Sequence, residues 1–165
     1  MRFSLRTLLW VTAAVAIFLA MPIRRAVMQK RGRQWVAMQR GHVTFSHKYN
    51  HATGEFDHRA NLRTPIWLIQ LVGIDFIDTV DTVVLDHTIV EDLTPIADLC
   101  ELRVLAIHIE IDDQLDFSPL CQLPGLRHLH LDYTDISAER LVKLRSLLPD
   151  VRVDATNHPP PESRR

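Results

Sequence analysis

Three segments in the second half of the chain repeat one pattern of apolar positions. Each begins with an apolar residue and carries two more, three and five positions later, so the pattern reads L-x-x-L-x-L. Alternation of this kind predicts a short strand whose apolar side chains all face one way. The segments begin 22 and 24 residues apart, and a fourth, truncated copy begins 22 residues after the third. The apolar residues of the four copies are Val80, Val83 and Leu85; Leu102, Leu105 and Ile107; Leu126, Leu129 and Leu131; and Leu148, Val151 and Val153.

The segments between the predicted strands also match one another. DLTPIADL from Asp92 to Leu99 and DFSPLCQL from Asp116 to Leu123 carry apolar residues and a proline at the same places. One such unit cannot bury its apolar side alone, whereas at least three stacked units can. We therefore expect an α/β fold in which three repeats and a fragment stack as a short solenoid over residues 80–154. Residues 138–148 are expected to form a capping helix at its far end.

The first apolar edge of this stack needs a cover, and residues 42–79 are expected to supply it. Residues 42–49 alternate in polarity with Val43 and Phe45 on one face, which favours a strand. The later segment PIWLIQLVG begins with a proline and ends with a glycine, as a short helix does. The residues of this helix expected to pack over the repeats are Trp67, Leu68 and Leu71.

The N-terminal end of the chain carries an apolar run of 17 residues, from Thr7 to Ile23, without a charge. As a helix it covers roughly 25 Å, the short end of what crosses a bilayer. Pro22 is expected near the end of that helix, where a missing backbone donor does least harm. An uncleaved transmembrane anchor over residues 1–23 is the favoured interpretation. A cleaved signal peptide and a buried core helix stay open, although the run lacks a convincing cleavage site and a polar face.

Charge is distributed unevenly along the chain. Residues 1–54 hold nine Lys or Arg and no acid, whereas residues 55–165 hold ten Lys or Arg and all twenty acids. The segment 24–41 predicts a basic juxtamembrane helix, weakened near Gly32. Its positive charge places the bulk of the chain on the cytoplasmic side of the membrane. Its side chains are expected either to contact anionic lipid or only to stop translocation. This basic collar consists of Arg24, Arg25, Lys30, Arg31 and Arg33.

The MRFSLRTLL start, the basic helix, the PIWL segment and repeats of the type LRHLHLDYTDIS resemble a known group of proteins. These are the short leucine-rich repeat proteins of bacteria that carry an N-terminal membrane anchor, and the resemblance covers residues 1–154. Such proteins usually place Asn, Thr or Cys at the ninth repeat position, which here holds Thr88, Glu110 and Thr134. Glu110 departs from that pattern, so the middle repeat is expected to turn irregularly. The resemblance implies a scaffold for protein contacts and no catalytic residues.

If the predicted strands stack in register, their outward residues form rows across neighbouring strands about 4.8 Å apart. The third row then places His108 between the carboxylates of Asp86 and Asp132. We expect this face to contact a partner, with ordinary solvated residues on an exposed sheet as the alternative. The expected interaction face consists of Asp86, His108, His128, His130 and Asp132. The rows are Thr82, Val104 and His128; Val84, Ala106 and His130; and Asp86, His108 and Asp132.

Other candidate chemistry is weakly indicated. The spacing of four histidines at positions 42, 47, 51 and 58 matches no zinc pattern, so no metal site is expected. The acids of the repeats predict a solvated face, and no nucleophile is flanked by a base and an orienting group. Cys100 and Cys121 are expected to be buried free thiols, although one disulfide between them stays open.

These observations predict a non-catalytic, single-pass membrane protein without a cofactor, whose leucine-rich repeat domain binds an unidentified protein. Nucleic acid is not an expected partner, because the basic segment holds one aromatic residue, Trp35. The alternatives are a structural membrane-surface protein without a specific partner and a His-rich metal-binding protein or enzyme. The expected parts are an anchor (1–23), a basic juxtamembrane helix (24–41), an N-terminal cap (42–79), the repeat domain (80–154) and a disordered tail (155–165).

Overall fold

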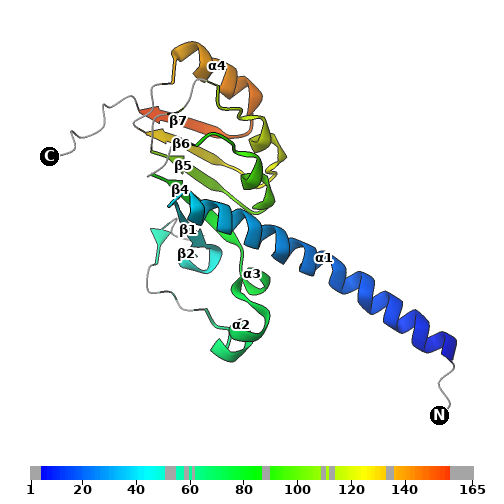
Figure 1. Cartoon of the computed structure of the whole chain (residues 1–165). Helices are drawn as coiled ribbons and strands as arrows, with labels where there is room; N and C mark the ends of the chain where they lie inside the picture. The colour runs from blue at the N-terminus through cyan, green and yellow to red at the C-terminus, as the bar shows by residue number, and fades with distance from the viewer. Residues whose placement is uncertain are drawn as a thin grey trace.

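The computed structural model describes residues 5–50, 55–57, 60, 62–86, 90–108, 111, 114–132 and 136–156. Over these residues the chain has a mixed α/β fold with one long N-terminal helix and a five-stranded sheet (Figure 1). The helices are α1 (Leu5–Met38), α2 (Ile66–Val72), α3 (Ile74–Ile77) and α4 (Ala138–Leu147), with 3₁₀ segments η1 (Ser46–Lys48), η2 (Thr94–Asp98) and η3 (Ser118–Gln122). The strands are β1 (His42–Phe45), β2 (Tyr49–Asn50), β3 (Glu55–Phe56), β4 (Val80–Leu85), β5 (Val104–Ile107), β6 (His128–Asp132) and β7 (Arg152–Thr156).

The five-stranded sheet has the order β1-β4-β5-β6-β7. Strands β4 to β7 are parallel to their neighbours, and β1 pairs antiparallel with the free edge of β4. The strand predicted around Val43 and Phe45 is therefore confirmed, although it ends at Phe45 and continues as η1. The short strands β2 and β3 pair separately with each other.

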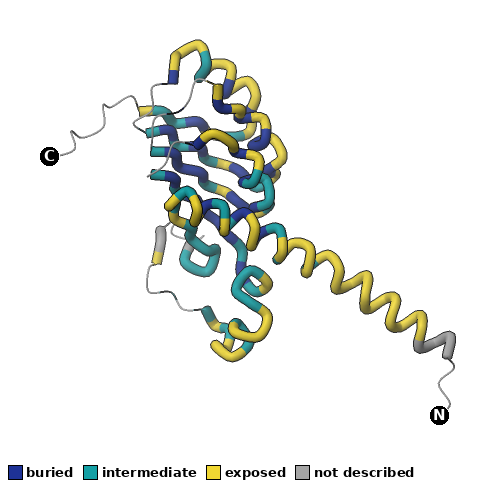
Figure 2. The backbone as a smooth tube through the Cα atoms, viewed as in Figure 1, coloured by how far each residue is buried: buried dark blue, intermediate teal, exposed yellow. Residues whose placement is uncertain are grey.

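The hydrophobic core lies on one side of this sheet. Alternate residues of β4 to β7 point into it, and η2 and η3 add Ile96 and Leu120. Figure 2 shows the buried segments gathered in the sheet and the turns beside it, while α1 is exposed over most of its length. Full burial of one such aliphatic side chain contributes about 1.5–3 kcal/mol. The strand residues of this core are Val80, Val83, Leu85, Leu105, Ile107, Leu129, Leu131 and Val153.

The fourth strand pairs two residues out of the predicted register. Val153 lies opposite Leu129, and Ala155 lies opposite Leu131, whereas the sequence pattern predicts Val151 opposite Leu129. A shift of two residues leaves every side chain on its predicted face, because side chains alternate with a period of two. The strand consequently runs to Thr156, so the tail predicted from residue 155 begins too early. The ninth repeat positions 88, 110 and 134 lie outside the described residues, as does the rest of the tail.

The segments predicted as an anchor and as a juxtamembrane helix form one continuous helix, α1, with Pro22 in its interior rather than near its end. Residues 9–21 are all exposed, which does not fit a buried core helix. The helix is long and apolar enough to cross a membrane. Its C-terminal part is different, because Gln29 and Val36 are buried against the rest of the fold.

Gly32 does not weaken α1 but lets it pack closely. A Cβ atom at this position would lie 2.7 Å from Cγ of Leu99, just after η2. That distance is shorter than carbon atoms tolerate, so no side chain larger than hydrogen fits without movement. Gly32 and Val36 are one helical turn apart and therefore share the face of α1 that contacts the core.

The predicted helix of the PIWLIQLVG segment is confirmed as α2, and it ends at Gly73, whose φ of +86° favours glycine. Its predicted packing is wrong for Trp67 and Leu71. Both side chains are exposed, and no residue of α2 is buried. The edge of the parallel strands is covered by β1 and by the C-terminal part of α1 instead.

Candidate functional site

The face of the sheet opposite the core presents the residues predicted as an interaction surface. Hydrogen bonding between the parallel strands fixes the register, so the outward side chains form straight rows. The first two predicted rows are confirmed as far as β6, and β7 extends both. The rows are Thr82, Val104, His128 and Arg152, and Val84, Ala106, His130 and Asp154.

In the third row, His108 pairs with the carboxylate of Asp132. Nε2 of His108 lies 3.3 Å from Oδ2 of Asp132, and both side chains are about one-third exposed, at 32% and 34%. Thr156 donates a hydrogen bond from its hydroxyl to the other oxygen of Asp132. The backbone N–H of His108 donates to the carbonyl of Leu85 at 2.8 Å, which continues the β4–β5 pairing past the last strand residue. The contact that the structure shows for the His108 ring is with Asp132; Asp86, which was also predicted to flank His108, directly follows β4.

A second histidine–carboxylate pair lies in the neighbouring row. Nδ1 of His130 is 3.8 Å from Oδ2 of Asp154, and the same carboxylate accepts a hydrogen bond from Nε of Arg152. The rings of His128 and His130 are stacked, with centroids 6.1 Å apart. Three histidines, two aspartates and one arginine thus share one partly exposed face of β5, β6 and β7.

Arg152, Asp154 and Thr156 were not among the predicted site residues. The sequence carried a signal for them, because the fourth L-x-x-L-x-L copy places alternate residues of the last strand on the outward face. The predicted copy was truncated and two residues out of register, so it could not pair these side chains with His130 and Asp132.

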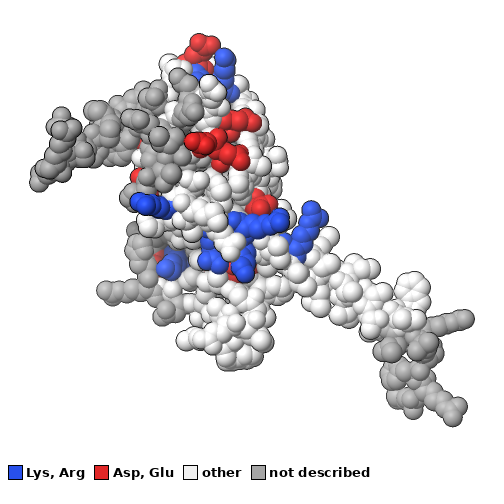
Figure 3. Space-filling view, viewed as in Figure 1, with Lys and Arg blue, Asp and Glu red and all other residues white. Residues whose placement is uncertain are grey.

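The basic collar is divided by the structure into two groups. Arg33 forms two hydrogen bonds with Asp75 of α3, and Arg25 lies 2.6 Å from a carboxylate oxygen of Glu101. The Arg33–Asp75 pair joins α1 to α3, whereas the Arg25–Glu101 pair is exposed on both sides, at 46% and 48%, and contributes little to stability. The contact of the collar with lipid stays a prediction. The remaining collar residues, Arg24, Lys30 and Arg31, are exposed. Figure 3 shows Lys and Arg gathered where α1 meets the other elements, and no charge along the described apolar part of the helix.

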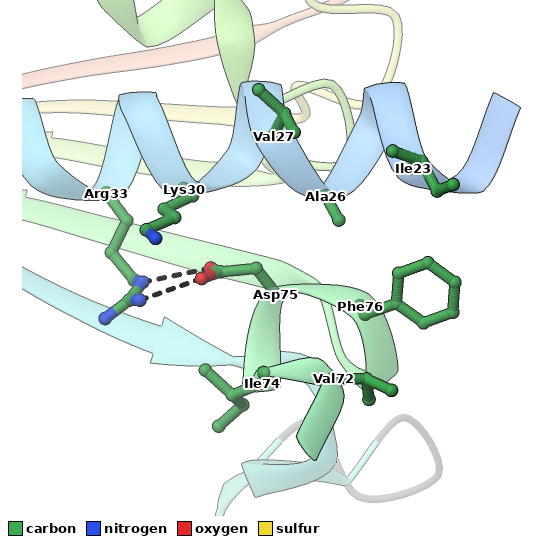
Figure 4. A pocket seen from close by; sticks show the side chains of 10 residues that line it. Ile23, Ala26, Val27, Lys30, Arg33, Val72, Ile74, Asp75 and Phe76 are labelled. Atoms are coloured by element: carbon green, nitrogen blue, oxygen red, sulfur yellow. Dashed lines mark hydrogen bonds and ion pairs between the residues drawn. The ribbon is translucent and has the colours of Figure 1, made fainter. Parts of the chain in front are cut away.

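A pocket of about 510 Å³ lies between α1 and α3. Figure 4 shows Arg33 and Lys30 of α1 directed toward α3, with Asp75 reaching back to Arg33 and Phe76 facing the turn of α1 that carries Ile23. The apolar lining outweighs the polar one. The residues that close the rest of the pocket are Ala26, Val27, Val72, Gly73 and Ile74.

A buried polar cluster surrounds Asp78 between α3 and β4. Its carboxylate accepts hydrogen bonds from the hydroxyl of Ser46 at 2.5 Å and from the backbone N–H of Thr79 at 2.9 Å, and it contacts the ring of His47. Gln29 of α1 donates to the backbone carbonyl of Asp78 at 2.7 Å. Burial by itself raises the pKa of Asp78, but these hydrogen bonds outweigh it, so the pKa lies below its ordinary value.

The four clustered histidines do not form a described metal centre. His47 belongs to the Asp78 cluster, His42 is exposed at the start of β1, and positions 51 and 58 lie outside the described residues. Among the residues that the structure describes, no three His, Cys, Asp or Glu side chains converge as metal ligands would. Cys100 and Cys121 are free thiols rather than a disulfide, but Cys121 is exposed and Cys100 is only half-buried, so their predicted burial is wrong for Cys121 and only partial for Cys100.

Comparison with known proteins finds no relative of this chain. No protein-family model matches the chain, and neither the curated proteins nor the solved structures give a match. The assignment of a function therefore depends on the residues and geometry described above.

Proposed function

We propose that this chain is a membrane-anchored leucine-rich repeat scaffold that binds another protein and catalyses no reaction. Residues 80–156 are the repeat domain in this proposal. The L-x-x-L-x-L segments coincide with parallel strands whose apolar residues face one core, and this supports the repeat assignment.

The segments after β4 and β5 give a second, independent support for repeats. Oδ1 of Asp92 accepts a hydrogen bond from the backbone N–H of Thr94 at 2.7 Å, just before η2. Oδ1 of Asp116 accepts the same bond from Ser118 at 2.8 Å, just before η3. Hydrogen bonds from the side chains of Thr94 and Ser118, and then these backbone bonds, lower the pKa of Asp92 and Asp116 below the ordinary value. One local turn therefore recurs at the equivalent place, 24 residues later in the chain.

The observation that carries the binding proposal is the pair of histidine–aspartate contacts in adjacent rows. His108–Asp132 and His130–Asp154 lie on rigid strands, yet each side chain remains partly exposed. Because each pair already holds its side chains in place, binding of a partner to their remaining donors and acceptors costs little side-chain entropy. The two pairs lie outside the hydrophobic core, which is on the opposite side of the sheet.

The binding proposal is tested by measuring which polypeptide the full chain retains when it is held in lipid nanodiscs. The wild-type chain, the double variant His108→Ala/His130→Ala and the control Lys143→Ala are compared under the same conditions. Lys143 is exposed on α4, away from the proposed face. We expect one polypeptide to be retained by wild type and control at equal levels and at least tenfold less by the double variant. Equal retention by all three would favour a structural membrane-surface protein without a specific partner.

The anchor of the proposed scaffold is α1, with the folded domain on the cytoplasmic side. The length and apolar surface of α1 support a single membrane crossing, and the basic collar after residue 23 supports the orientation. Arg24, Lys30 and Arg31 are the collar residues available to anionic lipid in this arrangement. A reporter fused after Arg165 tests the orientation: it is expected to be active in the cytoplasm, and activity only on the other side would reverse the assignment.

A further inference from the structure

Helix α2 exposes apolar side chains that a helix of a soluble domain would normally bury. Its sequence, IWLIQLV, holds no charged residue, and none of its residues is buried. Ile66, Trp67 and Leu71 are 73%, 65% and 74% exposed. Large apolar side chains grouped on one exposed helix mark a contact with a partner or a membrane rather than an ordinary surface.

The position of α2 along α1 distinguishes between these two contacts. Phe76 of α3 lines one pocket together with Ile23 and Val27 of α1, and a second pocket together with Met21. The uncharged run of α1 ends at Ile23. Only Gly73 separates α2 from α3, so α2 lies at this same level, to the side of α1 (Figure 1). A bilayer crossed by the apolar run therefore has its surface at α2.

The charges near α2 also fit the surface of a bilayer. Arg24 and Lys30 are exposed on α1 at this level, where they meet lipid phosphates. The acid of α3, Asp75, is paired with Arg33. Trp67 is a tryptophan, and tryptophan is enriched where acyl chains meet headgroups. A lipid surface at this level consequently contacts basic and apolar side chains and no unpaired carboxylate of α2 or α3 among the described residues.

From the exposed apolar side chains of α2 and their level beside α1, we propose that α2 and Phe76 form a second membrane contact. This contact lies along the boundary between headgroups and acyl chains, in the leaflet where α1 emerges. Helices in that boundary bury their apolar face about 5–10 Å deep. The pocket of Figure 4 then lies on the headgroup side of this contact, because its α1 residues run from Ile23 to Arg33. Two contacts instead of one fix the tilt of α1 and thereby the angle at which the histidine-bearing face is presented.

The inference rests on the proposed membrane anchor, and the three tryptophans of the chain allow the two to be tested separately. Trp10 lies in the apolar run, about 20 Å before its end at Ile23. Trp67 lies on α2, and Trp35 lies in the part of α1 packed against the core. Trp→Phe substitution of any two leaves one reporter in the full chain. Each single-tryptophan chain is reconstituted in vesicles of phosphatidylcholine and phosphatidylglycerol (7:3) whose acyl chains carry bromine near the headgroup or near the bilayer centre.

Trp10, about 5 Å inside the far end of the apolar run, and Trp67 should both be quenched more by bromine near the headgroup than by bromine near the bilayer centre. Trp35 should be quenched by neither. Quenching of Trp10 without quenching of Trp67 would overturn the second contact and leave the anchor standing. Absence of quenching at both sites would overturn the anchor itself. A different result would be that neither bromolipid nor aqueous acrylamide quenches Trp67 and that the solubilised protein is a dimer. That result would mean that a second copy of this chain, and not lipid, covers α2.

A pair of exposed substitutions checks that the apolar side chains of α2 cause the quenching. Ile66→Ser/Leu71→Ser in the chain retaining Trp67 is expected to reduce headgroup-region quenching at least twofold. The matched control is Val142→Ser, which removes an equally exposed apolar side chain, 66% accessible, from α4 at the other end of the sheet. This control is expected to leave the quenching unchanged. An equal response to both changes would contradict the proposal.

Discussion

The guanidinium of Arg33 in α1 donates two hydrogen bonds to the carboxylate of Asp75 in α3, of 3.0 Å from Nε and 2.8 Å from Nη2. Asp75 is 10% exposed and Arg33 is 34% exposed, so the pair lies at the edge of the interior. One turn earlier in α1, Gln29 donates to the backbone of Asp78. Polar contacts thus fix α1 at α3, while Val36 fixes it at the sheet by apolar packing. The helix that carries the apolar run is in this way joined to the rest of the fold by polar contacts and by apolar packing.

Arg33→Ala is expected to lower the free energy of unfolding by about 1–3 kcal/mol, because it leaves a mostly buried carboxylate without its main donor. Urea unfolding of the full chain in detergent micelles measures this change. Lys143→Ala removes an exposed ion pair with Glu139 and should cost no more than about 0.5 kcal/mol. Equal destabilisation by the two variants would show that the Arg33–Asp75 pair contributes only as a surface contact does.

Gly32→Ala is expected to destabilise the fold although alanine favours helices. Helix propensity gains about 1 kcal/mol, whereas forcing a methyl group into the contact with Leu99 costs about 1–3 kcal/mol. Gln34→Ala, at an exposed position of the same helix, serves as the control and should be neutral. The double variant Gly32→Ala/Leu99→Ala should show a favourable interaction energy in a double-mutant cycle. Strict additivity would contradict close packing between these two residues.

Stability is expected to fall in acid partly through Asp78. Its folded pKa is below the ordinary value, so its contribution is present above the unfolded pKa of about 3.9. That contribution is lost as pH falls through the lower folded pKa. Asp78→Asn should therefore be less stable at pH 7 yet lose less stability than wild type between pH 5 and pH 3. Urea midpoints at several pH values test this, with Glu139→Gln as an exposed control; parallel curves for wild type and Asp78→Asn would refute it.

Asp132→Ala is expected to change stability by less than about 1 kcal/mol, because its pair with His108 is a partly exposed one. Leu129→Ala, in the same strand but fully buried, should cost about 2–5 kcal/mol. Thermal unfolding of both variants makes the comparison. A large loss for Asp132→Ala would mean that the pair holds the sheet together, which would weaken its assignment to partner binding.

The strands β4, β5 and β6 could be predicted from the sequence because their signal is local. Val83, Leu105 and Leu129 each stand at the same place in one short pattern, and alternation alone assigns their faces. Once the faces are known, alignment of the copies on their apolar residues predicts the rows that join Thr82, Val104 and His128. Most of the candidate face followed from this reasoning.

The register of β7 could not be predicted in the same way. It depends on how many residues α4 and its turns need before the chain returns to the sheet, which is a property of packing. The truncated copy fitted at either Val151 or Val153, since both alternatives keep the same faces. The prediction placed Val151 opposite Leu129, so it did not pair His130 with Asp154.

The sequence by itself determined the apolar run of α1, the alternation of three strands and the uneven charge, because each depends on neighbours along the chain. Tertiary structure decided the rest. Gly32, which was predicted to weaken the helix, packs against Leu99, and Arg33, which was predicted to face lipid, pairs with Asp75. Tertiary structure also left Trp67 exposed beside the end of the apolar run. These outcomes depend on residues more than 40 positions apart, and one-dimensional patterns do not record which of them meet.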